Sequence, residues 1–471
     1  MIPLVEIAVL VRHFAPYFES VFSPEAFMHF QRYISGLILS ENKTVDGINR
    51  IFVSDTRNQS SLNRWLKASP FSVAALHQAR LALLWDRKGT AIKPKGVLSL
   101  DDTLLTHYGH HFDQIAKLFE HVSGAYVWAH NLVNLHYSED QTDYPISFQL
   151  WEPAEVDPLE AGLKGAGIRL RESKYRLKES DPRKWRTYLL GVWSRHQKEA
   201  AVQQIYQSKL IIGQQLLRQF FAAQPHLKQQ LPVTFDNWYT QPPFCQFLHE
   251  VLKGAYVGTL CGDETVHLAQ GATRLEVFAD QLKQEQHQAL QEGKKDVFRP
   301  ITISYKGEEE TYYSYCHTHR LSNLGKQRLV INHRHQDLSD SAIFFISNRL
   351  TWTAKGITRI RRHRWPVEVY HEEGKADGLD QYQVRDFEAI GKHIALVAVT
   401  YSLLRAAPHD TALLHSLHRT VQTTLDSSAG AVRRKTPAQA LWALAGLIQT
   451  GLAQDQTLKQ VMQPILAAVA S

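Results

Sequence analysis

The first part of the chain carries apolar residues at the spacing of helices. Phe27, Phe30, Ile34 and Leu37 recur every three or four residues, which places their side chains on one face of a helix. This pattern predicts a helical region over residues 1 to about 90.

Beyond Pro94 the pattern becomes that of a sheet, because short apolar runs rich in aromatic and β-branched residues indicate strands. The first group of expected strands comprises residues 96–103, 125–137 and 144–151, which would form a meander. A second group at 231–236, 255–261 and 342–347 alternates with helical stretches. A meander followed by such alternation predicts a mixed α/β sheet covered by helices.

Residues 262 to about 340 interrupt this alternation. Three further strands are expected there, at 298–305, 311–316 and 328–332, and they would form an antiparallel β unit. After the last strand of the second group, helical patterns run from about 355 through 375, from 390 to 405 and over 408–471.

The composition bounds the class of protein. Hydrophobic residues make up 44% of 471 positions and charged residues 21%, as in ordinary globular proteins. Lys and Arg outnumber Asp and Glu by 53 to 46, and a net charge of +7 suits a polyanionic partner. Three cysteines are too few for a secreted disulfide framework. With no signal-peptide pattern, and an apolar run at Ile394–Leu404 too short to cross a bilayer, we expect a cytoplasmic protein without membrane contact.

Two basic stretches are candidates for contacts with a nucleic-acid backbone. Residues 164–198 contain eleven Lys or Arg against three acids, with Tyr175, Trp185 and Trp193 interleaved. The second cluster consists of Lys355, Arg359, Arg361, Arg362 and Arg364. Lys and Arg contacts to phosphates supply much of the affinity for DNA. The alternative for both stretches is an ordinary solvated basic face.

Three acids are placed where a metal-dependent site is expected. Asp101 and Asp236 each close a predicted strand, and Glu368 lies on a predicted helix. Carboxylates at strand ends gather at one rim of such a sheet, and two or three of them suffice for Mg²⁺. Asp102 is the alternative to Asp101, since neighbours on a strand face opposite sides. The competing interpretation is that the acids cap turns or lie on a solvated helix face.

The neighbourhood of Glu368 strengthens the catalytic interpretation. Arg364 precedes it by four residues and Lys375 follows it by seven, so all three share one face of a continuous helix. If Pro366 instead marks the first helical turn, Arg364 lies just outside the helix. Two cations beside a carboxylate can grip phosphates, although a chain of exposed ion pairs would give the same spacing.

Arg364, Glu368 and Lys375 match the Arg-x3-Glu-x6-Lys part of a known signature. Here the chain resembles the bacterial insertion-sequence DDE transposases that carry Tyr-x2-Arg-x3-Glu-x6-Lys. The sequence Arg-Trp-Pro-Val-Glu at 364–368 is similar to the corresponding segment in one branch of that group. The chain departs from the signature at its first position, where Arg361 replaces the tyrosine.

Two earlier segments extend the resemblance in the expected order. Asp101-x-Thr103 resembles the first-strand motif of the family, and Phe235-Asp236-x-x-Tyr239 resembles the segment of its second acid. Together with the motif around Glu368, the resemblance covers roughly residues 95 to 405.

The resemblance implies a ribonuclease H-like fold: a mixed sheet with helices on both faces, interrupted by a β-rich insertion before the catalytic glutamate. It implies that Asp101 (or Asp102), Asp236 and Glu368 bind Mg²⁺, for which Mn²⁺ can substitute. The residues expected to contact DNA are Arg364, Lys375, Arg361, Arg362, Arg359 and Lys355.

The implied activity is that of a DNA transposase, which cuts transposon ends and joins the freed 3′-hydroxyl to target DNA. Its implied partners are double-stranded DNA, as inverted repeats and target, and a second copy of the chain in a homodimer on DNA. The alternatives are a catalytically silent DNA-binding protein and a nuclease of the same fold that cuts without joining.

The expected organisation has five parts, within a cytoplasmic protein associated with the bacterial nucleoid. They are a helical DNA-end-binding domain (1–92), the first part of the catalytic domain (93–261), the β-rich insertion (262–340), the second part of the catalytic domain (341–405) and a helical tail (406–471).

Overall fold

The computed structural model describes residues 2–54, 59–421 and 428–470. Its first elements are helices, several of which begin at a side-chain cap. Ser23, Thr44 and Ser72 each accept a hydrogen bond from a backbone N–H of the first helical turn, which satisfies a donor that has no partner within the helix. These elements are α1 (Val9–Phe14), η1 (Ala15–Val21), α2 (Pro24–Leu39), α3 (Val45–Arg50), α4 (Gln59–Ala68) and α5 (Val73–Trp85).

The centre of the described chain is a twelve-stranded mixed sheet. Its first strands are β1 (Val97–His107), β2 (Ala116–Glu120), β3 (Ala125–Ser138) and β4 (Asp143–Trp151). Strand β3 pairs antiparallel with β1 on one edge and with β2 and β4 on the other. The meander predicted from the sequence is therefore present, with β2 as an additional strand.

Two parallel strands complete the central part of the sheet. Strand β5 (Val233–Phe235) runs parallel to β1, and β6 (Tyr256–Leu260) runs parallel to β5. The resulting order β4-β3-β1-β5-β6, with three antiparallel strands followed by two parallel additions, is that of a ribonuclease H-like sheet. The predicted fold class is confirmed.

The strands after β6 extend the same sheet. Strand β12 (Ile343–Ser347) pairs antiparallel with β6, and β11 (Gly325–His333) and β10 (Glu308–Leu321) follow in turn. The remaining strands are β7 (Thr265–Leu268), β8 (Gly271–Arg274) and β9 (Arg299–Tyr305). The β unit expected at this place therefore continues the central sheet.

Helix α12 (Leu275–Gln291) lies among these strands and is not predicted by the sequence pattern. Most of its positions are polar, which hides the helical period. Its buried residues Leu275, Phe278 and Leu282 nevertheless follow the spacing of one helix face.

Helices cover both faces of the central sheet. Helix α10 (Lys209–Ala223) packs on β1 at Gly213, where an added Cβ would lie 2.5 Å from a methyl carbon of Leu100. On the opposite face, the Ser99 hydroxyl donates to the carbonyl of His363 at 3.1 Å, next to the start of α14 (Trp365–Ala376). Successive residues of β1 thus contact helices on opposite faces, as strand geometry requires.

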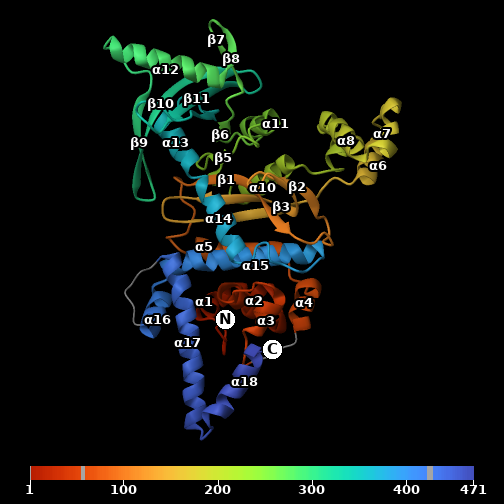
Figure 1. The fold of residues 1–471 in the computed structure, drawn as a ribbon, viewed down its shortest axis with the longest axis vertical. Helices are drawn as coiled ribbons and strands as arrows, with labels where there is room; N and C mark the ends of the chain where they lie inside the picture. The colour runs from red at the N-terminus through yellow and green to blue at the C-terminus, as the bar shows by residue number, and fades with distance from the viewer. Residues whose placement is uncertain (1, 55–58, 422–427, 471) are drawn as a thin grey trace.

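A buried helix joins the sheet to the N-terminal helices. Helix α15 (Phe387–Ala406) packs against β4 and lies beside α5, with α2 and its neighbours on the far side (Figure 1). By length and composition the stretch Phe387–His409 could cross a membrane, but 83% of its most apolar window is buried inside the protein. That burial is typical of a core helix.

Of the remaining helices, α13 (Ala354–Arg362) packs on strands β6, β9 and β12. The helical tail runs beside the N-terminal helices, on the other side of α15 from the sheet, and ends in the pair α17 and α18 (Figure 1). The bounds are α6 (Val156–Gly165), α7 (Arg176–Ser180), α8 (Pro182–His196), α9 (Ala200–Gln203), α11 (Pro242–Gln246), α13 (Ala354–Arg362), α16 (Thr411–Val421), α17 (Ala429–Ala453) and α18 (Leu458–Ala470).

The prediction of one continuous helix from about 355 through 375 is wrong. It divides at His363 into α13 and α14, and Arg364 occupies the position just before α14. Pro366 stands in the first turn of α14, where its missing N–H costs no hydrogen bond. The alternative that Pro366 marks the first helical turn, with Arg364 just outside the helix, is confirmed.

Candidate active site

Asp101 lies midway along β1. The parallel pairing of β1 with β5 ends at the pair Leu100 and Phe235, whereas the pairing with β3 continues to His107. The prediction that Asp101 closes its strand is therefore wrong, since β1 is longer than its apolar run. Asp101 is the first residue of β1 beyond the cover of β5.

Asp236 directly follows β5, at the carboxyl end where ligands gather in sheets of this kind. Its Oδ1 accepts hydrogen bonds from the backbone N–H groups of Trp238 and Tyr239, at 3.1 and 3.2 Å. The side chain thus closes the turn after the strand, as the competing interpretation proposed, and it also faces the site.

The neighbouring acids Asp101 and Asp102 turn to opposite faces of β1. Asp101 forms an ion pair with Arg364 before α14. Asp102 accepts from Lys209 of α10 at 2.9 Å and from the Tyr239 hydroxyl at 3.0 Å. Both nevertheless line one cavity, because the edge of β1 is uncovered where β5 stops. Asp102 therefore accompanies Asp101 at the site.

This cavity, here called the acidic cavity, has a volume of about 420 Å³. Three of its carboxylates come from Asp101, Asp102 and Asp236, and Lys209 and Lys375 supply cations. The other lining residues are Thr103, Leu104, Leu118, Phe119, Glu120, His121, Val122, Asn131, Trp151 and Trp238. Two acids that are 135 residues apart in the sequence are thereby brought together.

Burial and mutual repulsion make these carboxylates a site for positive charge. Burial raises the pKa of Asp101 to about 7, opposed by Arg364 and reinforced by the charges of Asp236 and Asp102. Burial likewise raises the pKa of Asp236. A cation placed between such groups stabilises their charged forms against both burial and mutual repulsion.

Glu368 is linked to the acidic cavity through an arginine. Arg364 forms ion pairs with both Asp101 and Glu368, so its guanidinium stands between the two carboxylates. Glu368 itself lines a second cavity, of about 350 Å³, here called the arginine cavity. The lining residues are Tyr312, Arg334, Ile343, Phe345, Thr358, Arg361, Arg362, Arg364, Trp365 and Glu368.

Two of the basic residues of α13 form ion pairs with acids of the protein. Arg359 pairs with Asp140 at 3.0 Å, and Arg362 pairs with Glu310 at 2.9 Å. Lys355 is exposed on the first turn of the helix. The predicted cluster is thus divided between structural ion pairs and solvent.

Arg361, which replaces the tyrosine of the signature, is held against the sheet. Its Nε donates to the Thr259 hydroxyl at 2.6 Å, and its guanidinium lies over the ring of Phe345. Burial, together with the nearby charge of Arg364, lowers the pKa of Arg361 to about 10. Arg361 faces the arginine cavity as a cation short of carboxylate partners.

Lys209 and Tyr239 complete the site around Asp102. Lys209 is a functional candidate that the sequence reasoning missed. The signal was weak: a single basic residue follows the helix cap Ser208 at the start of an apolar helix. Only the fold places that residue beside an acid 107 positions earlier.

The carboxylates fit a hard divalent cation in chemistry. Asp101 and Asp236 offer oxygen donors, which Mg²⁺ prefers, and each is buried beside other negative charge. Among the described residues no group of three or more His, Cys, Asp or Glu side chains is close enough to hold a metal ion. The intervening Arg364 separates Glu368 from the other acids.

Comparison with known proteins gives a family match and distant structural likenesses. A family model described as DDE superfamily endonuclease matches residues 16–275, more than half of the chain. A solved structure, the cryo-EM structure of a piggyBac transposase synaptic complex with hairpin DNA, has 11% sequence identity and a TM-score of 0.33. That match covers 94% of this chain and 78% of the other. No curated protein matches the chain.

Proposed function

The chain belongs to the DDE superfamily of endonucleases, and from this premise we propose that it is a DNA transposase. It would cut transposon ends and join the freed 3′-hydroxyl to target DNA. The observation that carries the proposal is the gathering of Asp101 and Asp236 in one buried cavity, with Glu368 joined to Asp101 through Arg364. These are the three acids that the sequence motifs single out.

In this proposal Asp101 and Asp236 hold Mg²⁺, with Asp102 beside them, and Glu368 joins once Arg364 turns away. The bound metal would supply Lewis-acid stabilisation of the attacking and leaving oxygens of a phosphodiester. The residues of the chain position the DNA and balance charge. Because the reaction is in-line phosphoryl displacement, it needs no covalent enzyme intermediate.

The cations around the acids would bind the DNA phosphates. Lys375 lines the acidic cavity, and Arg361 and Arg364 line the arginine cavity. An arginine released from a carboxylate can make two parallel hydrogen bonds to a phosphate. Arg364 would therefore exchange its carboxylate partners for the DNA backbone when metal and substrate bind.

Arg364→Ala tests this exchange without DNA. The variant should bind Mn²⁺ roughly tenfold more tightly than the wild type, because Asp101 and Glu368 lose their neutralising cation. Calorimetric titration with Mn²⁺ measures the affinity. Arg362→Ala is the matched control, since its partner Glu310 lies outside the acidic cavity. Unchanged Mn²⁺ affinity in Arg364→Ala would show that Arg364 has only a structural role.

We also propose that the protein acts as a homodimer, joined by the helical tail. Residues 436–453 of α17 carry no charge, and Leu441, Trp442 and Leu452 are about half exposed on the projecting pair of helices (Figure 1). An uncharged apolar face is self-complementary and suits a second copy related by twofold symmetry.

The double variant Leu441→Ser and Trp442→Ser should shift the protein from dimer to monomer. Light scattering after size-exclusion chromatography, with and without duplex DNA, should change from twice 53.8 kDa to 53.8 kDa of protein. Met28→Ser, another exposed apolar position, should leave the mass of the dimer unchanged. A monomeric wild type in both conditions would contradict the proposal.

A strand-transfer assay distinguishes the proposed function from its two alternatives. Labelled DNA carrying the inverted repeats that flank the coding region would be incubated with target plasmid and Mg²⁺. Joined products support a transposase, and cut but unjoined products indicate a nuclease. Binding without cutting would indicate a catalytically silent protein. End recognition is assigned to the helical region over residues 1–92.

A further inference from the structure

Residues 156–203 form a small helical unit between β4 and α10, here called the helical module. It contains α6, α7, α8 and α9 and has a hydrophobic core separate from the main one. The buried members within the module are Leu159, Leu163, Trp185, Leu189, Val192, Trp193 and Val202. In Figure 1 the module projects from one side of the sheet, away from the strands of the β insertion.

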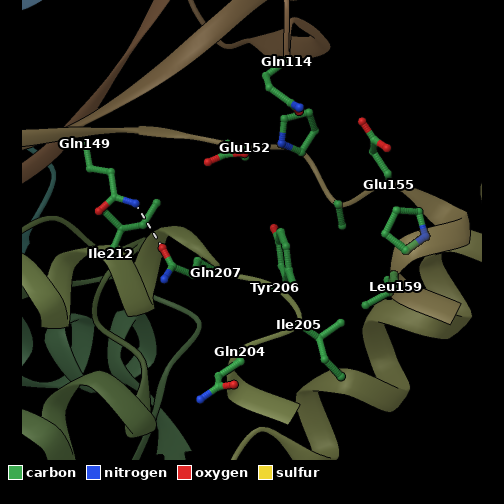
Figure 2. Close-up of a pocket in the computed structure, with 13 residues that line it drawn as sticks. Gln114, Gln149, Glu152, Glu155, Leu159, Gln204, Ile205, Tyr206, Gln207 and Ile212 are labelled. Carbon is green, nitrogen blue, oxygen red and sulfur yellow. Dashed lines mark hydrogen bonds between the residues drawn. The ribbon is translucent and has the colours of Figure 1, made fainter. Parts of the chain in front are cut away.

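Two short segments connect the module to the sheet around a third cavity, of about 410 Å³ (Figure 2). Two hydrogen bonds cross this junction. The Gln149 amide donates to Gln207 at 3.0 Å, and the Trp151 indole donates to the Tyr206 hydroxyl at 2.9 Å. The module is therefore a separately packed unit that is attached to the sheet through two short chain segments, here called its base.

The base of the module lies at the acidic cavity. The entering segment leaves β4 at Trp151 and the returning segment reaches α10 at Lys209, and both residues line that cavity. A ligand held along the module is consequently directed toward Asp101 and Asp236.

The module carries most of the excess positive charge of the chain. Residues 156–203 contain eleven Lys or Arg and six Asp or Glu, an excess of five out of seven for all 471 residues. Part of this charge is used internally. The buried carboxylate of Glu160 pairs with Lys164 at 2.6 Å and with Lys178 at 3.0 Å, and it also accepts from the Trp185 indole.

Four exposed arginines of the module have no such use. Arg169, Arg171, Arg176 and Arg183 are exposed, and no ion pair to the described acids restrains their side chains. Of the six acids of the module, three pair with lysines and one pairs with His196, which leaves Glu172 and Glu179 without an ion pair among the described residues. The free charge that remains on the module is therefore largely cationic.

We propose that the helical module grips the phosphate backbone of double-stranded DNA beside the scissile phosphate. Guanidinium groups bind phosphate through paired hydrogen bonds, and a basic surface of this kind binds DNA without reading its sequence. The inference rests on the proposed function, because it takes DNA to be the substrate of the acidic cavity. It adds a second contact region, separate from the arginine cavity and from the N-terminal helices.

The test uses the full chain with Arg169, Arg171, Arg176 and Arg183 all changed to Gln. Binding to a fluorescent 30-base-pair duplex would be followed by anisotropy across a series of salt concentrations. Loss of up to four phosphate contacts should weaken binding at least about tenfold at low salt and reduce the slope of log K against log salt by roughly 2 to 3.6. The matched control changes four scattered exposed cations to Gln, namely Lys295, Arg299, Lys326 and Lys459.

The control should bind within about threefold of the wild type with nearly the same slope. If module and control variants lose affinity equally, the effect is only that of net charge and the inference is overturned. A module variant that loses affinity for single-stranded RNA but not for duplex DNA would overturn it as well. A wild type that binds no DNA would defeat the proposed function itself. Unchanged unfolding temperatures of both variants establish that the fold is intact.

Discussion

Glu368→Ala is expected to abolish divalent-cation-dependent strand cleavage while leaving DNA binding nearly intact. Loss of one carboxylate that completes a two-metal site should remove several kcal/mol of transition-state stabilisation, a rate decrease on the order of 1000-fold. Affinity for duplex DNA should change by less than about fivefold, because it depends mainly on Lys and Arg contacts to phosphates. Single-turnover cleavage at saturating DNA and anisotropy binding measure the two effects separately.

Glu372→Ala is the matched control for this variant. Glu372 lies one turn later on α14, is exposed, and should cleave at the wild-type rate. Cleavage by Glu368→Ala at the wild-type rate would remove Glu368 from the catalytic machinery. The assignment would also fail if both variants lost activity together, since a general disturbance of α14 would then explain the result.

Acidification from pH 6.5 to 4.5 should lower the free energy of unfolding by roughly 5 kcal/mol, as much as half the stability of an ordinary domain. The cause is a set of histidines buried in the neutral form. Burial lowers the pKa of His77 to about 3, of His371 to about 3 and of His393 to about 4. Each of these three rings makes hydrogen bonds that fit one neutral tautomer. The Nε2 of His371, for example, accepts from the Asn134 amide at 3.0 Å.

The sign follows from where the proton binds. Below the ordinary histidine pKa of about 6.5, these histidines bind protons in the unfolded chain but remain neutral in the folded chain. Each histidine therefore removes about 1.4 kcal/mol of stability per pH unit until its folded pKa is reached. Asp101 has the opposite effect, because its raised pKa of about 7 lets the folded state bind a proton first. The stability lost through the three histidines is larger than the stability gained through Asp101, so the free energy of unfolding falls on acidification.

Urea unfolding followed by tryptophan fluorescence at pH 6.5, 5.5 and 4.5 measures this effect. His371→Gln should reduce the dependence on pH by about one proton. A midpoint in urea that is constant over this pH range would contradict the account.

The sequence was sufficient for the parts of the fold that local pattern controls. Alternation and β-branched residues identified β3 and β4, and the short apolar runs identified β5, β6 and β12. It failed at α12, where polar residues obscure the helical period. It also failed at the end of β1, which pairing with β3 extends to His107 through residues of mixed polarity.

The sequence singles out the acids of the candidate site, and it gives little information about the residues around them. Asp101 and Asp236 were recognisable by their places after apolar runs, and the motif identified Glu368. Whether Arg361 and Arg364 face solvent, a carboxylate or the sheet depends on tertiary contacts such as that to Thr259. Contacts between residues far apart in the chain produce no periodic pattern in the sequence, so they could not be predicted from it.

The central claim is that Asp101, Asp236 and Glu368 act together on one divalent-metal site. Crystals of the full chain grown with cleaved-end DNA and Mn²⁺ test it directly through anomalous scattering. We expect a Mn²⁺ peak in the acidic cavity, bound by Asp101 and Asp236, with Arg364 moved from between Asp101 and Glu368 to a DNA phosphate. DNA bound with no Mn²⁺ at these carboxylates, or with Mn²⁺ only elsewhere, would contradict it.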